Sequence, residues 1–174
     1  GKAVSFSLIP RGVYERVTDI SPKKLAEKGI KLVLADLDNT LVPYHVIEPG
    51  EEVRRWKEEL NANGITLFLL SNSRRPTRPS HFANCLGIDF IGHAGKPKKG
   101  GYLRALERTG FAREQVVMVG DQIFTDTLGG NCAGVKTILV KAIHNHNFWL
   151  KLRHVAEKPF IFAAKKRRIK YEKS

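Results

Sequence analysis

The chain has 174 residues, of which 42% are hydrophobic and 27% are charged, and this composition is typical of one soluble globular domain. No apolar run approaches the roughly 18 residues that a membrane-spanning helix needs, and no secretory signal is visible. The net charge of +13 predicts an anionic partner, which could be nucleic acid, acidic lipid or a multiply phosphorylated substrate.

Strand-like and helix-like patterns alternate along the chain. Five short apolar runs predict strands at Lys31–Asp36, Ile65–Leu70, Ile88–Ile91, Gln115–Val119 and Thr137–Val140. Helical spacing predicts helices at Glu51–Asn61, Pro76–Leu86, Gly101–Thr109 and Asp126–Ala133. This alternation predicts an α/β fold around a parallel sheet that is buried on both faces.

The pentapeptide Asp36–Thr40 follows the first predicted strand directly. Two carboxylates two residues apart can divide the work of phosphoryl transfer, one attacking phosphorus and the other protonating the leaving group. An acidic turn is the simpler alternative, since Asp, Asn and Thr favour turns and caps. A calcium loop is excluded, because its sixth and twelfth positions hold Leu41 and Ile47 instead of Gly and Glu.

Further polar groups follow the other predicted strands. The second strand leads into Ser71-Asn72-Ser73, the third into Lys96-Pro97, and the fourth into Gly120-Asp121-Gln122 with Asp126 beyond. Carboxyl ends of parallel strands share one edge of a sheet, where α/β proteins bind their ligands. The sequence therefore predicts that acids, a hydroxyl, an amide and a lysine gather at one edge.

In these four motifs, residues 28–140 resemble the haloacid dehalogenase superfamily of phosphohydrolases. The runs Asp36–Val42 and Gly120–Asn131, with Lys96-Pro97, are similar to the subfamily IIIA phosphatases, which include bacterial and mitochondrial phosphatidylglycerophosphatases. The resemblance implies a Rossmann-like three-layer sandwich with about five parallel strands in the order 5-4-1-2-3. It also implies an enzyme, a phosphoric monoester hydrolase.

The resemblance assigns Asp36 as the nucleophile and Asp38 as the general acid and then base. It implies Mg²⁺ as the cofactor, held by the Asp36 and Asp121 carboxylates and the Asp38 backbone carbonyl. Asp126 would bind the ion indirectly, or cap the following helix instead.

By the same resemblance, Ser71 and Lys96 bind the phosphoryl group, and Lys96 also neutralises charge during the reaction. Asn72 would contact phosphate or shape its loop. Ser73 stands where many relatives have a second Asn. Residues expected to order the motif loops are Asn39, Thr40 and Gln122.

Many relatives carry a cap domain, but the gaps after the first two predicted strands are too short for one. The site is therefore expected to be open and to accept a phosphate on a lipid, protein or nucleic acid. Nearby cations could hold a second phosphate of the substrate: Arg74, Arg75, Arg78, Lys98 and Lys99.

The C-terminal segment carries most of the charge. Residues 141–174 contain 10 Lys/Arg and 2 Asp/Glu, which is +8 of the total +13. Aromatic residues interleave with these cations, as at a membrane interface, although a helix packed on the sheet would explain them equally well. We expect a phosphatase domain at residues 1–145 and a basic, helical tail at residues 146–174 of the same domain.

The subfamily resemblance, the expected open site and the basic tail together favour hydrolysis of phosphatidylglycerophosphate at the cytoplasmic face of a bacterial membrane, or on the mitochondrial matrix side in a eukaryote. The alternatives are a phosphatase for phosphoproteins or nucleic acids, and a non-catalytic nucleic-acid or ribosome-binding module. Cys85 and Cys132 show no metal-binding spacing, so a reducing, intracellular setting is expected.

Overall fold

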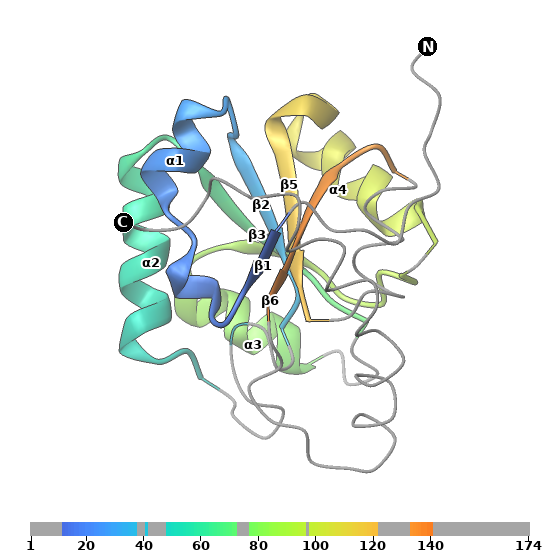
Figure 1. Ribbon diagram of the computed structural model, residues 1–174. Helices are drawn as coiled ribbons and strands as arrows, with labels where there is room; N and C mark the ends of the chain where they lie inside the picture. The colour runs from blue at the N-terminus through green and yellow to red at the C-terminus, as the bar shows by residue number, and fades with distance from the viewer. Residues whose placement is uncertain are drawn as a thin grey trace.

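The computed structural model describes residues 12–37, 41, 48–72, 77–96, 98–121 and 133–140 (Figure 1). Within these residues, six strands form one sheet in the order β1-β6-β5-β2-β3-β4, and every neighbouring pair is parallel. The strands are β1 (Gly12–Tyr14), β2 (Leu32–Ala35), β3 (Thr66–Leu70), β4 (Asp89–Ile91), β5 (Val116–Gly120) and β6 (Lys136–Val140).

The five predicted strands are confirmed in the predicted order, since 5-4-1-2-3 corresponds to β6-β5-β2-β3-β4. The predicted strand count was wrong, because β1 adds a sixth strand beside β6. This strand has only three residues, and they lie between charged neighbours. Its pairing with β6 is a tertiary contact. A segment of three residues is too short for its hydrophobic pattern to predict such a contact.

Helices cover both faces of the sheet, as the predicted three-layer sandwich requires. They are α1 (Pro22–Glu27), α2 (Glu51–Ala62), α3 (Thr77–Leu86) and α4 (Gly100–Thr109), with 3-10 turns at Val17–Asp19 and Arg113–Gln115. Buried residues of α1, α2 and α3 form one cluster with alternate strand residues such as Val33 and Leu67. The strand residues between them, such as Leu34 and Phe68, pack with α4 on the opposite face.

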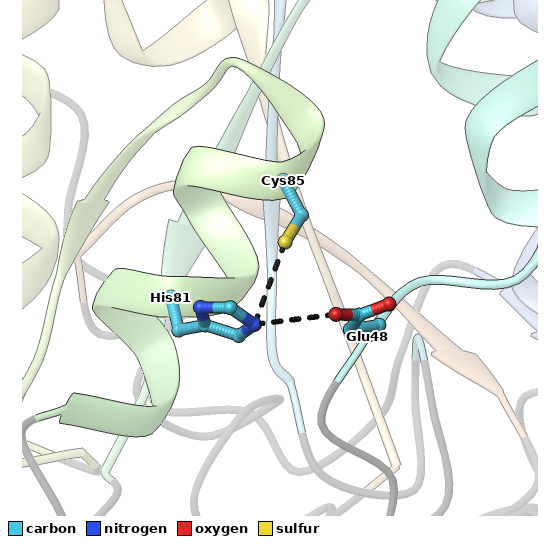
Figure 2. Close-up of side chains that lie close together, drawn as sticks. All are labelled: Glu48, His81 and Cys85. Carbon is cyan, nitrogen blue, oxygen red and sulfur yellow. Dashed lines mark hydrogen bonds and ion pairs between the residues drawn. The ribbon is translucent and has the colours of Figure 1, made fainter.

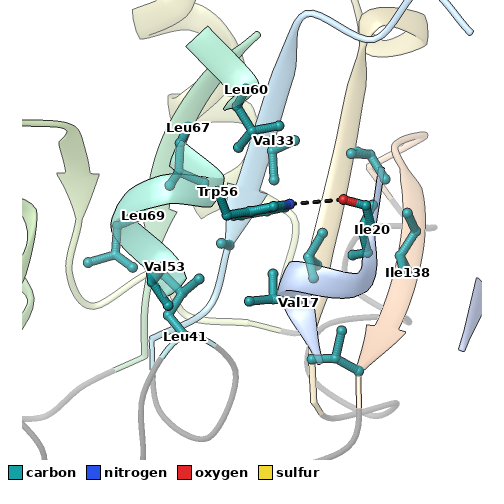
Figure 3. Packing of buried hydrophobic residues seen from close by; sticks show 14 of the residues in the cluster. Val17, Ile20, Val33, Leu41, Val53, Trp56, Leu60, Leu67, Leu69 and Ile138 are labelled. Carbon is teal, nitrogen blue, oxygen red and sulfur yellow. Dashed lines mark hydrogen bonds between the residues drawn. The ribbon is translucent and has the colours of Figure 1, made fainter. Parts of the chain in front are cut away.

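Helix α2 illustrates how the sequence pattern produces the first of these clusters. Val53, Trp56 and Leu60 form its buried stripe, as their spacing predicts. The indole Nε1 of Trp56 also donates a buried hydrogen bond of 2.9 Å to the Ile20 carbonyl (Figure 3). This bond joins α2 to the segment before α1. Helix α1 is short, and the sequence interpretation did not include it.

The predicted helices at residues 51–61, 76–86 and 101–109 are confirmed with ends shifted by one residue at most. The predicted helix at Asp126–Ala133 and the C-terminal tail at 146–174 lie outside the described residues. In the described part of the chain, no helix is both long enough and apolar enough to cross a membrane. Between β3 and β4 the described residues form one helix, α3, and they contain no cap domain.

Candidate active site

Three polar residues directly follow the carboxyl ends of the central strands. Asp36 follows β2, Ser71 follows β3 and Asp121 follows β5. The pairing register places the strand ends level, with Ala35 opposite both Leu69 and Val119. All three polar residues are buried, with exposed fractions of 8% for Asp36, 1% for Ser71 and 2% for Asp121. The predicted gathering of motifs at one sheet edge is present in the structure.

Lys96 reaches this edge from the loop after β4. Its Nζ atom lies 3.3 Å from Asp36 Oδ1, with the lysine side chain 1% exposed and the aspartate side chain 12% exposed. The ammonium is thus enclosed while the carboxylate keeps an opening to solvent. A buried pair at this distance attracts strongly, since little water screens it. The arrangement suits an accessible nucleophile with a cation fixed beside it.

The loop that carries Lys96 is fastened to the end of β3 at two consecutive positions. The Ser71 carbonyl accepts a bond of 2.9 Å from Ala94 N–H. The Asn72 side chain bonds the Lys96 main chain in both directions: Nδ2 donates to the carbonyl and Oδ1 accepts from N–H, each at 2.9 Å. Of the two roles expected for Asn72, shaping the loop is therefore the one that its hydrogen bonds support.

Gly101 also positions this loop, and the sequence interpretation had assigned it no role. A Cβ atom at Gly101 would lie 2.3 Å from the Ala94 carbonyl oxygen, which is far inside van der Waals contact. The first turn of α4 can approach the loop closely only because this side chain is absent. In the sequence, the Gly100-Gly101 pair at the start of a predicted helix was the feature that could have indicated this close approach.

The expected phosphate-binding cations are partly placed. Lys98 and Lys99 are exposed just before α4, and Arg78 is half-buried in the first turn of α3. Both helices follow strands of the parallel sheet, so each begins at the same end of the sheet as Asp36, Ser71 and Asp121. Site residues that lie outside the described part of the chain remain predictions: Asp38, Asn39, Thr40, Ser73, Arg74, Arg75, Gln122 and Asp126.

The buried acids fit a hard divalent cation. The Asp36 and Asp121 carboxylates follow neighbouring strands, and the Oδ1 atom of Asp121 is shielded from solvent. Oxygen donors from one or two carboxylates, completed by water, are the ligands that Mg²⁺ takes in phosphoryl-transfer sites. The donor set thus agrees with the Mg²⁺ expectation, with Asp36 and Asp121 as the described residues that would hold the ion.

Comparison with known proteins connects this geometry to a family. A family model described as HAD-hydrolase-like matches residues 93–151. The chain is 33% identical over 160 residues to the probable phosphatase YqeG of Bacillus subtilis, covering 91% of this chain and 92% of that protein.

Two further likenesses are more distant. The chain is 29% identical over 145 residues to phosphatidylglycerophosphate phosphatase 1, chloroplastic/mitochondrial, of Arabidopsis thaliana. That match covers 79% of this chain but 39% of the plant protein, so the chain spans well under half of that relative. The fold is similar to cobalt-bound deoxy-D-mannose-octulosonate 8-phosphate phosphatase of Haemophilus influenzae, with TM-score 0.51, 17% identity, and coverage of 81% and 92% of the two chains.

Proposed function

The chain belongs to the haloacid dehalogenase superfamily of phosphatases, and from that premise we propose that it hydrolyses phosphatidylglycerophosphate to phosphatidylglycerol and phosphate. The observation that carries the chemistry is the Asp36–Lys96 pair of 3.3 Å at the carboxyl edge of the sheet. The choice of a lipid substrate is supported by the likeness to the plant phosphatase and by the charge of the chain.

In the proposed reaction, an Asp36 carboxylate oxygen forms a bond to phosphorus while the bond from phosphorus to the glycerol oxygen breaks. Asp38 gives its proton to the departing alkoxide and then takes one from the water that hydrolyses phospho-Asp36. Lys96 and Ser71 stabilise the phosphoryl oxygens, and the fixed ammonium acts where charge develops. Mg²⁺, held by Asp36 and Asp121, would further neutralise the phosphoryl charge.

The surroundings of the site favour a large, anionic substrate. A capless edge cannot enclose a small metabolite, but it can accept a phosphate that projects from a surface. Phosphatidylglycerophosphate carries a phosphodiester beside its terminal monoester, which the cations Lys98, Lys99 and Arg78, near the starts of α4 and α3, would bind. The +8 charge of residues 141–174 would attract anionic lipid headgroups, placing the enzyme at the cytoplasmic or matrix surface of a membrane.

The direct test is phosphate release from phosphatidylglycerophosphate in mixed micelles with Mg²⁺, beside a panel of soluble phosphates. We expect preferred turnover of the lipid, loss of activity in Asp36→Asn, and loss on chelation of Mg²⁺. Asp89→Asn is a matched control, because Asp89 is an exposed aspartate on β4 that pairs with Arg108. Activity confined to soluble phosphates, phosphopeptides or nucleic acid ends would refute the lipid assignment while retaining the phosphatase.

A second pair of variants tests whether Lys98 and Lys99 bind the lipid. Lys98→Ala/Lys99→Ala should raise KM for the lipid several-fold and leave turnover of a small aryl phosphate nearly unchanged. Lys23→Ala/Lys28→Ala removes the same charge from exposed positions in and just after α1, which leads into the opposite end of β2. Equal effects of the two pairs would mean that overall charge, and not a local subsite, attracts the lipid.

A further inference from the structure

A second group of ligand-type side chains lies apart from the buried acids. Glu48, His81 and Cys85 place a carboxylate oxygen, an imidazole nitrogen and a thiol sulfur within 4.8 Å of one another (Figure 2). His81 Nε2 is 3.7 Å from Glu48 Oε1 and 3.6 Å from Cys85 Sγ. The glutamate and histidine side chains are 68% and 49% exposed, and the cysteine is half-buried.

The nitrogen-to-oxygen separation of 3.7 Å is longer than a direct hydrogen bond, and the nitrogen-to-sulfur separation of 3.6 Å fits a hydrogen bond to sulfur as well as the edge of a metal coordination tetrahedron. With Zn–N of about 2.0–2.1 Å and Zn–S of about 2.3 Å, a tetrahedral angle separates nitrogen from sulfur by about 3.6 Å. The corresponding nitrogen-to-oxygen edge is about 3.4 Å, whereas an N–H···O hydrogen bond would be about 2.9 Å long. The two observed distances from His81 Nε2, 3.6 and 3.7 Å, match these edges, and the third separation, between Glu48 and Cys85, is within 4.8 Å.

The backbone holds the three residues in place independently of any ion. His81 and Cys85 are four residues apart on α3, so their side chains lie on the same face one turn apart. Glu48 lies two residues before Gly50, the N-cap of α2. Arg54 of α2 donates a hydrogen bond of 2.9 Å to the Cys85 carbonyl, which fixes α2 against the end of α3. The glutamate is therefore brought to the histidine–cysteine face by a tied pair of helices.

We propose that Glu48, His81 and Cys85 bind a zinc-type divalent ion, with water as the fourth ligand. Imidazole and thiolate are the donors that Zn²⁺ selects, in contrast to the all-oxygen donors at Asp36 and Asp121. The ion would connect Glu48, just before α2, to α3. Both follow strands whose ends carry site residues, so the ion would brace the supports of the active site without touching substrate.

Cobalt titration of the purified full chain tests this proposal, since Co²⁺ replaces Zn²⁺ and reports its ligands spectroscopically. We expect one equivalent of Co²⁺ to produce a thiolate-to-cobalt charge-transfer band and four-coordinate visible bands, both abolished by Zn²⁺. Cys85→Ser should remove the charge-transfer band. His81→Ala and Glu48→Gln should each weaken Zn²⁺ binding by about tenfold or more.

Three controls separate this site from other sources of metal binding. Asp36→Asn/Asp121→Asn should retain the charge-transfer band, because the proposed site does not use the buried acids. Cys132→Ser and His93→Ala should also retain it, since the first removes the other cysteine and the second another exposed histidine. A band that depends on Cys132, or one that is lost with the two aspartates, would overturn the proposal.

A measurement on the unaltered protein tests the proposal even if the variants fail to fold. Zn²⁺ should slow alkylation of Cys85 by about tenfold or more at saturation while leaving Cys132 unaffected, as mass spectrometry of the labelled peptides would show. Equal labelling rates with and without Zn²⁺ would refute binding at Cys85, whatever the phosphatase assays give.

Discussion

Substitution of Asn72 tests whether this residue fixes the position of Lys96 or holds phosphate itself. Asn72→Ala removes two hydrogen bonds of 2.9 Å to the Lys96 main chain. Each contributes about 1 kcal/mol net, so partial replacement by water leaves a loss of about 1–2 kcal/mol in the free energy of unfolding. The greater effect is expected on catalysis, because Lys96 then loses its fixed position beside Asp36.

The size of that catalytic effect follows from the 3.3 Å separation of Lys96 Nζ and Asp36 Oδ1. If the loop relaxes by about 1 Å, the attraction at an effective dielectric constant of about 20 weakens by about 1 kcal/mol. The transition state would lose similar stabilisation from the ammonium, which corresponds to a fall in kcat of about fivefold to tenfold. Phosphate affinity should fall no more than kcat does, because the Asn72 side chain bonds the Lys96 main chain and would act on phosphate through Lys96.

Steady-state kinetics and urea denaturation of the same preparations provide the assay, with phosphate inhibition as the measure of phosphate affinity. Asn63→Ala is the matched control, because Asn63 is an exposed asparagine whose side chain donates to the Glu59 carbonyl at the end of α2. The reasoning is refuted if Asn72→Ala weakens phosphate binding while kcat and stability stay unchanged. That outcome would place Asn72 on the substrate.

Two further substitutions test how the fold supports the site. Gly101→Ala, whose Cβ would lie 2.3 Å from the Ala94 carbonyl oxygen, should lower the free energy of unfolding by about 1–3 kcal/mol and reduce activity, whereas Gly100→Ala, with open space around its Cβ, should preserve or raise stability. Equal urea midpoints for the two variants would contradict the close approach. Trp56→Phe deletes the donor to the buried Ile20 carbonyl and should cost about 2–4 kcal/mol in stability, measured by circular dichroism in urea. A loss below about 1 kcal/mol would mean that this bond matters little.

The sequence predicted the features that depend on strand periodicity. Because buried parallel strands read as apolar runs, their ends could be located, and the approach of Lys96 to Asp36 followed from the shared edge. The choice between the two roles of Asn72 could not be predicted, since it depends on one side-chain orientation against a loop distant in sequence. Strand β1 was missed because its three residues gain their pairing only from β6.

The group of Glu48, His81 and Cys85 shows a different limit of sequence reading. The two cysteines lack a metal-binding spacing between them, whereas the proposed site uses the spacing of His81 and Cys85 on one predicted helix. Glu48 lies more than thirty residues earlier, and only the packing of α2 against α3 brings it near. A ligand set that combines two residues of one helix with a residue distant in the sequence can be recognised only from the tertiary structure.

The two proposed ion sites differ in donor chemistry, which makes their contributions separable in one protein. Oxygen donors at Asp36 and Asp121 favour Mg²⁺, while sulfur and nitrogen at Cys85 and His81 favour Zn²⁺. An ion that binds only the folded state stabilises it by about 2.7 kcal/mol at one hundred times its Kd. Zn²⁺ should therefore raise the melting temperature of Asp36→Asn/Asp121→Asn as much as that of the unaltered protein, and should leave that of Cys85→Ser unchanged. Since Mg²⁺ prefers oxygen ligands, its effect on activity should persist in Cys85→Ser, so that bracing and catalysis would depend on different ions.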